Sequence, residues 1–205
     1  VRARFAIVAG NAYLGNLLPE LAAKSMPCGS QVIATEPLDE ASARALLPGD
    51  HCVEDCNYLL DYYRLSGDKR LIFGGGVVYG ARDPANIESI IRPKMLKAFP
   101  QLKDVKIDLA WGGPMACSPN LFPQVGTLPG RSNAFFVQGY SGFGVTPSHI
   151  ICKVLAEGMS EGSARYDLVS SIHRPTIIGK DAIRPLLLTA GKSWHQLSGY
   201  WNGRR

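Results

Sequence analysis

The chain has 205 residues, of which 46% are hydrophobic and 19% charged, so its composition is that of an ordinary globular protein and not of a disordered one. Its formal net charge is +5 and its basic residues are scattered, so we predict no nucleic-acid partner. No apolar run is long enough to span a bilayer, so we predict no membrane association. Five dispersed cysteines predict reduced thiols and a cytoplasmic protein.

The first predicted element is a buried strand over residues 5–10, an apolar run that ends in glycine. The chain enters this strand without an initiator Met or a targeting segment, so we expect a longer parent sequence. A short helix is predicted over 14–23. The proline and glycine at 26–29 predict a break, and the next strand is predicted over 31–35.

A β-hairpin over residues 57–73 is the clearest antiparallel signal. Side chains alternate along its first strand, which puts Tyr62 and Arg64 on one face, and the turn falls at 66–68. The three glycines at 74–76 are expected to take the chain out of the sheet, because glycine reaches backbone angles that other residues avoid.

The second half of the chain alternates helical and strand patterns. Helical spacing over 87–99, with Pro93 inside, predicts a kinked helix or two short helices that meet at Pro93. Strands are predicted over 105–111 and 134–138. A glycine-rich turn at 139–144 then leads into a helix over 146–159, with Thr146 as N-cap and Pro147 as its first residue. The rest of the chain is expected to wrap the surface.

This order of elements predicts an α/β fold with an α+β insertion. A partial α/β domain is expected from residues 1–25 and 131–165, because these flank the hairpin region at both ends. Residues 26–130 form a separate domain built on an antiparallel sheet, and residues 166–205 form a carboxy-terminal extension.

The turn at 139–144 is the principal candidate site. A helix start fronted by glycines offers free backbone N–H groups and the positive end of a helix dipole, which suit an anion or a polarised carbonyl. A purely structural tight turn is the alternative. The cluster of His51, Cys52 and Cys56 lacks a second pair of ligands, so no metal site is predicted.

Several motifs in order resemble the D-amino-acid-oxidase/glycine-oxidase superfamily of FAD-dependent enzymes. The resemblance covers roughly residues 5–160 and is greatest to the branch that acts on gamma-glutamylputrescine. No single motif is decisive, but their order is specific. The motifs lie at 8–13, 62–65 with 70–75, 99–102, 110–113 and 138–145.

The resemblance implies an enzyme that binds FAD non-covalently and oxidises an amine to an imine, by hydride transfer to the flavin N5. It makes the α/β pieces remnants of an FAD-binding domain and the insertion a substrate domain. It implies substrate contacts for Tyr62, Arg64 and Trp111, and assigns no catalytic residue. The implied flavin contacts are Tyr140, Ser141, Gly142, Phe143, Gly144, Val145 and Thr146.

Other interpretations of the substrate-side residues remain open. Tyr62 is equally compatible with a place on a half-buried sheet surface, and Arg64 with a salt bridge at the rim of the sheet. Trp111 is equally compatible with core packing.

The sequence also departs from the family. Phe143 stands where many amine-oxidising relatives have histidine, and Met115 where glycine-oxidase-like members have a carboxylate-binding arginine. Leu121 replaces an arginine, and Pro114 fills the position at which the sarcosine-oxidase branch attaches flavin through cysteine. These differences argue against a simple amino acid as substrate and against covalent flavin.

The glycine fingerprint that binds the ADP half of FAD does not occur in this sequence. We therefore expect the chain alone to bind FAD weakly or not at all and to be inactive. Its expected partners are a small amine and the missing amino-terminal half or a partner chain. Two alternatives remain: a non-catalytic remnant or binding module, and an unrelated anion-binding α/β protein.

Overall fold

The computed structural model describes residues 2–57, 59–79, 84–160, 162–177 and 190. Their contacts divide the chain into two compact units. The first consists of Val1–Cys28 with Met115–Arg205, and the second of Gly29–Pro114. The first unit is thus made from both ends of the chain, with the second inserted between them; the predicted domain bounds, 1–25 with 131–165, 26–130 and 166–205, stay a prediction. The assignment of these units to flavin and substrate domains stays a prediction.

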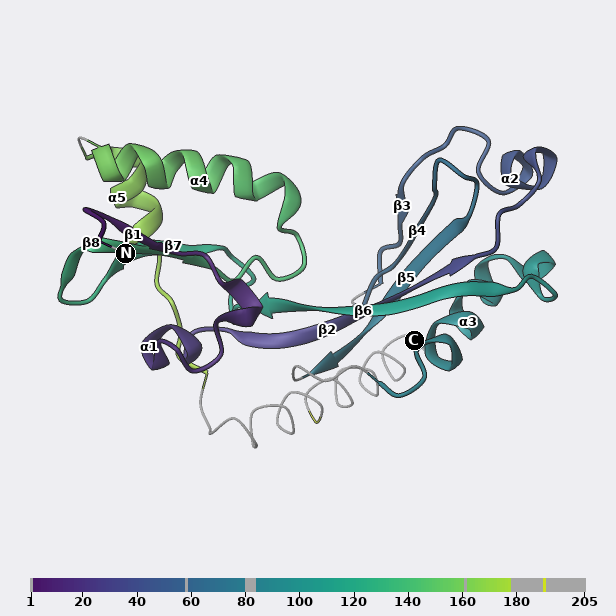
Figure 1. The fold of residues 1–205 in the computed structure, drawn as a ribbon, viewed down its shortest axis with the longest axis horizontal. Coiled ribbons are helices and arrows are strands. Elements are labelled where there is room, and N and C mark those ends of the chain that lie inside the picture. Colours follow the sequence, from purple (N-terminus) through teal and green to yellow (C-terminus); the bar gives the residue numbers. More distant parts are fainter. Residues whose placement is uncertain (1, 58, 80–83, 161, 178–189, 191–205) are drawn as a thin grey trace, which may run out of the picture. The chain divides into compact units, whose positions relative to one another are not determined.

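The first unit is built on a three-stranded sheet in the order β1-β8-β7. Strand β1 (Ala6–Val8) runs parallel to β8 (Arg131–Gln138), with Ile7 opposite Phe135, and β7 (Gln124–Leu128) runs antiparallel to β8. Helices α4 (Val145–Ser160) and α5 (Ala164–Ser170) lie over one face, and α1 (Pro19–Ala22) and the 3-10 helix η1 (Asn11–Leu14) over the other (Figure 1).

Strand β8 is apolar at consecutive positions because both of its faces are covered. Phe135 and Val137 pack with the helices α4 and α5, whereas Ala134 and Phe136 pack with η1 and α1. Alternation along a strand sends successive side chains to opposite faces, so a continuous apolar run satisfies both layers. This arrangement fixes the end of β8, from which the candidate site begins.

The second unit contains most of a five-stranded sheet in the order β3-β4-β5-β2-β6. The strands are β3 (Val53–Glu54), β4 (Asp61–Leu65), β5 (Leu71–Tyr79), β2 (Met26–Thr35) and β6 (Ile107–Cys117). Strands β3, β4 and β5 pair antiparallel, which agrees with the predicted hairpin.

Three helices accompany this sheet: α2 (Glu40–Leu46), α3 (Ile87–Ala98) and the 3-10 helix η2 (Pro100–Leu102). The core of the second unit joins the sheet to these helices. Leu71 and Phe73 of β5 and Ile91 and Met95 of α3 are almost completely buried in it. Pro93 lies inside α3, as the sequence predicts.

The segment after α5 packs into the first unit. The Arg174 guanidinium donates to the carbonyls of Val125 and Ser170 and lies 5.3 Å from the centre of the Phe136 ring. The Ile177 N–H donates to the Ala23 carbonyl at 2.9 Å. Residues 162–177 are therefore part of this unit's packing, whereas the prediction for the end of the chain falls on residues outside the described ranges.

Two predicted breaks are wrong. Strand β2 already begins at Met26, because Pro27 lies near the strand's start, where a missing N–H is tolerated. Residues 74–76 do not leave the sheet, since β5 continues to Tyr79. Gly74 is opposite Tyr62 in the pairing, and a Cβ there would overlap the tyrosine ring. This glycine makes room for a cross-strand ring and does not end the strand.

Two helix predictions also need correction. The predicted helix over 14–23 is two short helices, η1 and α1, because Gly15 between them has a φ of 55°. Helix α4 begins at Val145, so Thr146 is its second residue and not its N-cap, and Pro147 follows as the third. No helix in the described ranges combines the length and the hydrophobicity that crossing a membrane requires.

Candidate functional site

Residues 139–144, which we call the glycine turn, connect β8 to α4. The Phe143 N–H donates to the Tyr140 carbonyl at 3.0 Å, which closes a four-residue turn. Its two central residues, Ser141 and Gly142, have φ values of 55° and 95°. Positive φ at both central positions is the signature of a primed turn, and glycine adopts it without steric cost whereas serine does not.

The glycine turn is held from two sides by the rest of the first unit. The Ser141 N–H donates to the Ala116 carbonyl at 2.9 Å, and the Ser118 N–H donates to Ser141 Oγ at 3.1 Å. At the start of the turn, the Gly139 N–H donates to Asn11 Oδ1 at 3.0 Å. These bonds compensate for the unfavourable φ of Ser141 and fix the direction in which the remaining amides point.

The glycine turn and the helix start leave several N–H groups available. Val145 is 84% exposed, and both Gly142 and Thr146 are exposed as well. A helix has no internal acceptors for its first N–H groups, and Pro147 contributes none. Within residues 139–146, the N–H groups that have no acceptor among the described residues are those of Tyr140, Gly142, Gly144, Val145 and Thr146.

The electrostatics of this helix start favour an electron-rich ligand. The first turn of α4 contains no acidic side chain that would neutralise the positive end of its dipole. Burial and the neighbouring Cys152 raise the pKa of Tyr140 to about 12, so its phenol is neutral at physiological pH. Neither an acidic side chain of the first turn nor an ionised Tyr140 therefore offsets the positive end of the α4 dipole.

The glycine turn fits the pyrimidine edge of a flavin. That edge carries carbonyl oxygens and gains negative charge on reduction, and N–H donors on an exposed backbone match it. Gly142 and Gly144 put no side chain over these donors, and Phe143, 58% exposed, adds an apolar surface beside them. The flavin contacts implied for residues 140–146 stay a prediction.

The substrate-side candidates all lie in the second unit. Tyr62 and Arg64 share one face of β4, while Leu65, on the other face, is buried in the core. The Tyr62 hydroxyl is 2.8 Å from Ser30 Oγ, and Arg64 Nε donates to the Leu65 carbonyl at 3.0 Å. Arg64 is exposed and Trp111 is 43% exposed. Their roles toward a substrate stay predictions.

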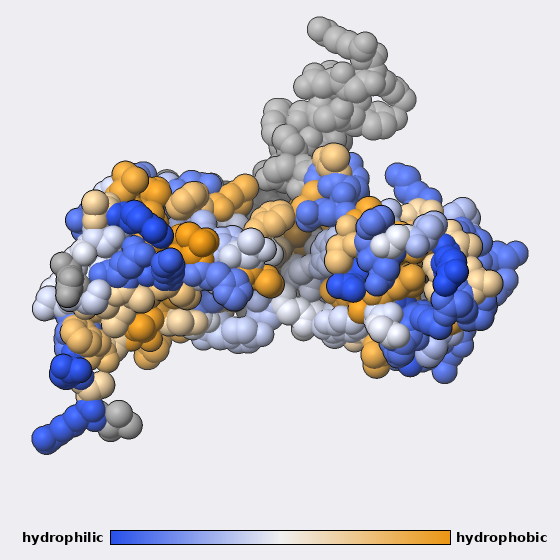
Figure 2. Space-filling view, turned by 90° about the horizontal axis from the view of Figure 1, so that it is seen from above, coloured by the Kyte–Doolittle hydropathy of each residue, from blue (hydrophilic) through white to orange (hydrophobic). Residues whose placement is uncertain are grey.

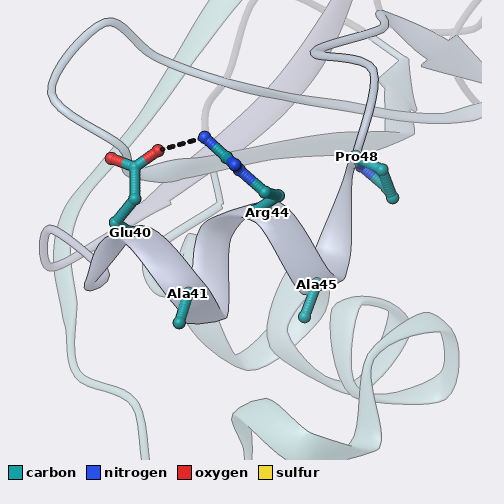
Figure 3. A pocket seen from close by; sticks show the side chains of 5 residues that line it. All are labelled: Glu40, Ala41, Arg44, Ala45 and Pro48. Atoms are coloured by element: carbon teal, nitrogen blue, oxygen red, sulfur yellow. Dashed lines mark hydrogen bonds and ion pairs between the residues drawn. The ribbon is translucent and has the colours of Figure 1, made fainter.

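A hollow of about 580 Å³ lies beside α2 (Figure 3). The side chains of Glu40 and Arg44 form an ion pair at 3.2 Å along its rim, and both are exposed. All of its lining residues are exposed, so this hollow has no buried polar group that could orient a substrate. None of them is among the predicted site residues: they are Glu40, Ala41, Arg44, Ala45 and Pro48.

Of the residues that depart from the family pattern, Phe143 belongs to the glycine turn and Met115 lies beside Gly142. Met115 is half-buried, and its sulfur is 3.0 Å from where a Cβ on Gly142 would lie. Leu121 is exposed and has a φ of 57°. In the described ranges, no three side chains of His, Cys, Asp or Glu gather as metal ligands do.

Sequence reasoning missed two residues that hold the glycine turn, Asn11 and Ser118. Asn11 has a φ of 44°, a conformation that asparagine tolerates better than most residues. An asparagine directly after a strand that ends in glycine is a weak signal for such a role. Ser118 gave no signal, because its contact with Ser141 joins residues far apart in the sequence.

Comparison with known proteins gives consistent matches. The sequence profile of the family described as "FAD dependent oxidoreductase" (DAO) matches residues 1–158. Gamma-glutamylputrescine oxidoreductase of Escherichia coli K12 is 49% identical over 198 residues, which are 96% of this chain and 46% of that protein. The probable oxidoreductase OrdL of Haemophilus influenzae is 34% identical over 93% of this chain and 44% of its own length.

Solved structures agree on the fold. Glycine oxidase from Geobacillus kaustophilus superposes with a TM-score of 0.67 at 18% identity, over 86% of this chain and 46% of the other. L-proline dehydrogenase from P. horikoshii gives a TM-score of 0.64 at 20% identity, over 78% of this chain and 43% of the other. The chain therefore spans less than half the length of these proteins.

Proposed function

Because this chain belongs to the FAD-dependent oxidoreductase (DAO) family, we propose that it is the carboxy-terminal part of a flavoenzyme that oxidises an amine. The substrate class is an amine or an amino-acid-conjugated amine, and the first product is an imine, which water converts to an aldehyde. The observation that carries this proposal is the set of acceptor-free N–H groups at the glycine-fronted start of α4.

The residues of the first unit would hold the flavin ring. When bound, FAD would supply the two-electron acceptor, taking a hydride at N5 from the carbon that bears the amine. The N–H groups of Gly142, Gly144 and Val145 would donate to the polar edge of the ring, and the dipole of α4 would favour negative charge there. Ser141 contributes by fixing the backbone, since its own N–H is already bonded to Ala116.

A glutamyl-conjugated amine is the substrate class that the second unit supports best. The relative of this chain from Escherichia coli is named for gamma-glutamylputrescine, a molecule that carries a carboxylate at the end remote from the reacting amine. Arg64 offers an exposed guanidinium that could pair with a carboxylate, and Tyr62 and Trp111 offer flat apolar surface. Met115 and Phe143 supply no proton acceptor, so we assign no general base.

The chain needs a second polypeptide segment to act. Its relatives are more than twice as long, and its sequence lacks the glycine fingerprint for the ADP half of FAD. We therefore propose that FAD binds only when the amino-terminal half, in the same chain or as a partner, is present. The cytoplasmic localisation predicted from the cysteines belongs to the same proposal.

A non-catalytic binding module is the second candidate function. It is favoured by the combination of Phe143, Met115 and Leu121, where the family pattern has a histidine and two arginines. In that case the glycine turn would keep its shape but the complete protein would turn over no amine.

Reconstitution tests the two functions against each other. The chain is co-expressed with the amino-terminal half of the Escherichia coli relative, and the complex is examined for flavin absorbance and for gamma-glutamylputrescine oxidation. A yellow, active complex supports the proposed function, and a yellow but inactive one supports the binding module. A colourless complex whose two halves still co-purify would contradict the flavin assignment.

The substrate class is tested at Arg64 in the same complex. Arg64→Gln should raise KM for gamma-glutamylputrescine by roughly tenfold or more, because a charged hydrogen bond to the carboxylate is lost. Putrescine lacks that carboxylate, so its KM should change little and it is the matched control. An equal effect on both amines would mean that Arg64 does not recognise the carboxylate.

A further inference from the structure

Several polar side chains share the face of the second unit's sheet that points away from its core. Tyr62 of β4 is paired with Glu54 of β3 and with Gly74 of β5, and residues directly opposite each other in an antiparallel pair point to the same face. Arg64, two residues along β4, points to this face as well. Ser30 of β2 joins them, since its Oγ is 2.8 Å from the Tyr62 hydroxyl. We call Ser30, Glu54, Tyr62 and Arg64 the polar face cluster.

The polar face cluster contains one negative and one positive charge that do not neutralise each other. Glu54 and Arg64 are both exposed, and neither forms an ion pair with any residue in the described ranges. Arg64 instead donates through Nε to the Leu65 carbonyl at 3.0 Å. Diagonal neighbours on paired strands have their Cβ atoms about 7–8 Å apart. This separation leaves space between the two charges for a small ligand that carries both signs.

Tyr62 is the neighbour that both charged residues share, and it is held in one orientation. Its ring lies against Gly74, where a Cβ would overlap it, and its hydroxyl is hydrogen-bonded to Ser30. A side chain that is already ordered loses little conformational entropy when a ligand binds. Tyr62 therefore offers a fixed flat surface for the methylene groups of a ligand whose charged end lies between Glu54 and Arg64.

We propose that Glu54 and Arg64 together bind the amino-acid head of a gamma-glutamyl amine, Glu54 its α-ammonium group and Arg64 its α-carboxylate. A gamma-glutamyl group is joined through its side-chain carboxyl, so its α-ammonium and α-carboxylate are both free. These two groups are attached to one carbon, and they match a carboxylate and a guanidinium on the same face of a sheet. The identity of the amine rests on the proposed function, whereas recognition of a head with both charges does not. Glu54 is thereby added as a residue that determines specificity.

Two amides that cannot be oxidised separate recognition of the head from turnover. Gamma-glutamylbutylamide keeps the α-ammonium and the α-carboxylate but lacks the reacting amine, and glutarylbutylamide lacks the α-ammonium as well. Isothermal titration calorimetry measures the dissociation constant of each probe for the complex with the amino-terminal half. If the halves do not assemble, the 205-residue chain is titrated alone, because it contains the whole polar face cluster. We expect gamma-glutamylbutylamide to bind at least about fivefold more tightly than glutarylbutylamide.

Variants assign this preference to Glu54. Glu54→Gln keeps the shape of the side chain but removes its charge, so the dissociation constants of the two probes should come within about twofold of each other. Glu54→Asp keeps the charge and should retain most of the preference. Arg64→Gln should weaken both probes, since both carry the carboxylate. Glu88→Gln, at a partly exposed glutamate of α3 on the core side of the sheet, is the matched control and should bind both probes like wild type.

Three results would overturn the proposal: equal binding of the two probes by the wild type, a preference that survives Glu54→Gln, and no binding of either probe. Failure of the proposed function is a different result. A complex without flavin or turnover that still prefers gamma-glutamylbutylamide would contradict the flavoenzyme and support the head-group site. An active complex that binds both probes equally would support the flavoenzyme and refute the role of Glu54.

Discussion

Gly142 occupies the position in the glycine turn where a side chain would be most unfavourable. Its φ is 95°, and a Cβ there would lie 3.0 Å from the sulfur of Met115. We expect Gly142→Ala to lower the free energy of unfolding by about 1–2 kcal/mol, since an L-residue pays this much for left-handed backbone. Urea unfolding followed by circular dichroism measures the change.

Gly144→Ala is the matched control for that substitution. A Cβ at Gly144 would be 3.5 Å from the Tyr140 Cβ, an ordinary contact, and its φ is not positive. Its stability should stay within about 1 kcal/mol of wild type. Equal destabilisation by both alanines would show that the turn does not depend on the φ of Gly142.

Tyr140 gives the glycine turn a dependence on alkaline pH. Burial and Cys152 raise the pKa of its phenol from 10.0 to about 12. Between these two pH values, the phenol of the unfolded chain loses its proton while that of the folded chain keeps it. The contribution of Tyr140 to the free energy of unfolding is therefore complete below pH 10 and falls as the pH rises toward 12. Tyr140→Phe should therefore lose less stability than wild type across this window, as urea unfolding at successive pH values would show. Parallel curves for the two proteins would contradict the raised pKa.

Much of the candidate site could be predicted from local sequence because its features are local. Glycines before an amphipathic helix are visible in a few residues, and the helix start that they predict lies within two residues of the observed one. The contacts that hold the turn could not be predicted in this way. Asn11 and Ser118 reach it only through the parallel pairing of β1 with β8 and through the position of β6.

At the scale of elements, the β4–β5 hairpin shows why a glycine run was misinterpreted. Local propensity treats consecutive glycines as a strand end, whereas here Gly74 accommodates the Tyr62 ring from the paired strand. Cross-strand contacts decide what a strand tolerates, and a single sequence does not display its pairing partners. The hairpin itself was predictable because its alternation and its turn are adjacent in the chain.

Gly74→Ala should destabilise the second unit by about 2 kcal/mol. The new methyl group would displace the Tyr62 ring and break its hydrogen bond with Ser30, so it combines overpacking with a lost bond. Gly113→Ala, where a Cβ meets nothing within 4 Å, is the control and should be nearly neutral. In a Tyr62→Ala background the cost of Gly74→Ala should largely vanish, and persistence of the full cost in that double-mutant cycle would exclude the ring as its cause.

At the scale of the whole molecule, the first unit has an exposed apolar sheet edge. Strand β1 is an edge of its sheet in the described part of the chain, with only β8 as neighbour, and Ile7 on it is 51% exposed. Figure 2 shows hydrophobic surface interspersed with polar surface over this unit. Exposed apolar residues beside an unpaired strand edge are typical of an interface, and the missing half of the family's enzymes is the occupant that we propose.

A charge on this edge should prevent assembly with the amino-terminal half. Ile7→Lys would put an ammonium group where the second half is expected to cover β1. Because burying an unpaired charge is unfavourable, the dissociation constant of the two halves should rise at least about tenfold. Leu168→Lys, at a comparably exposed leucine on α5, is the control and should assemble like wild type. Analytical ultracentrifugation of mixed halves measures both. Wild-type assembly by Ile7→Lys would place the second half elsewhere, and the proposal that it covers β1 would be wrong.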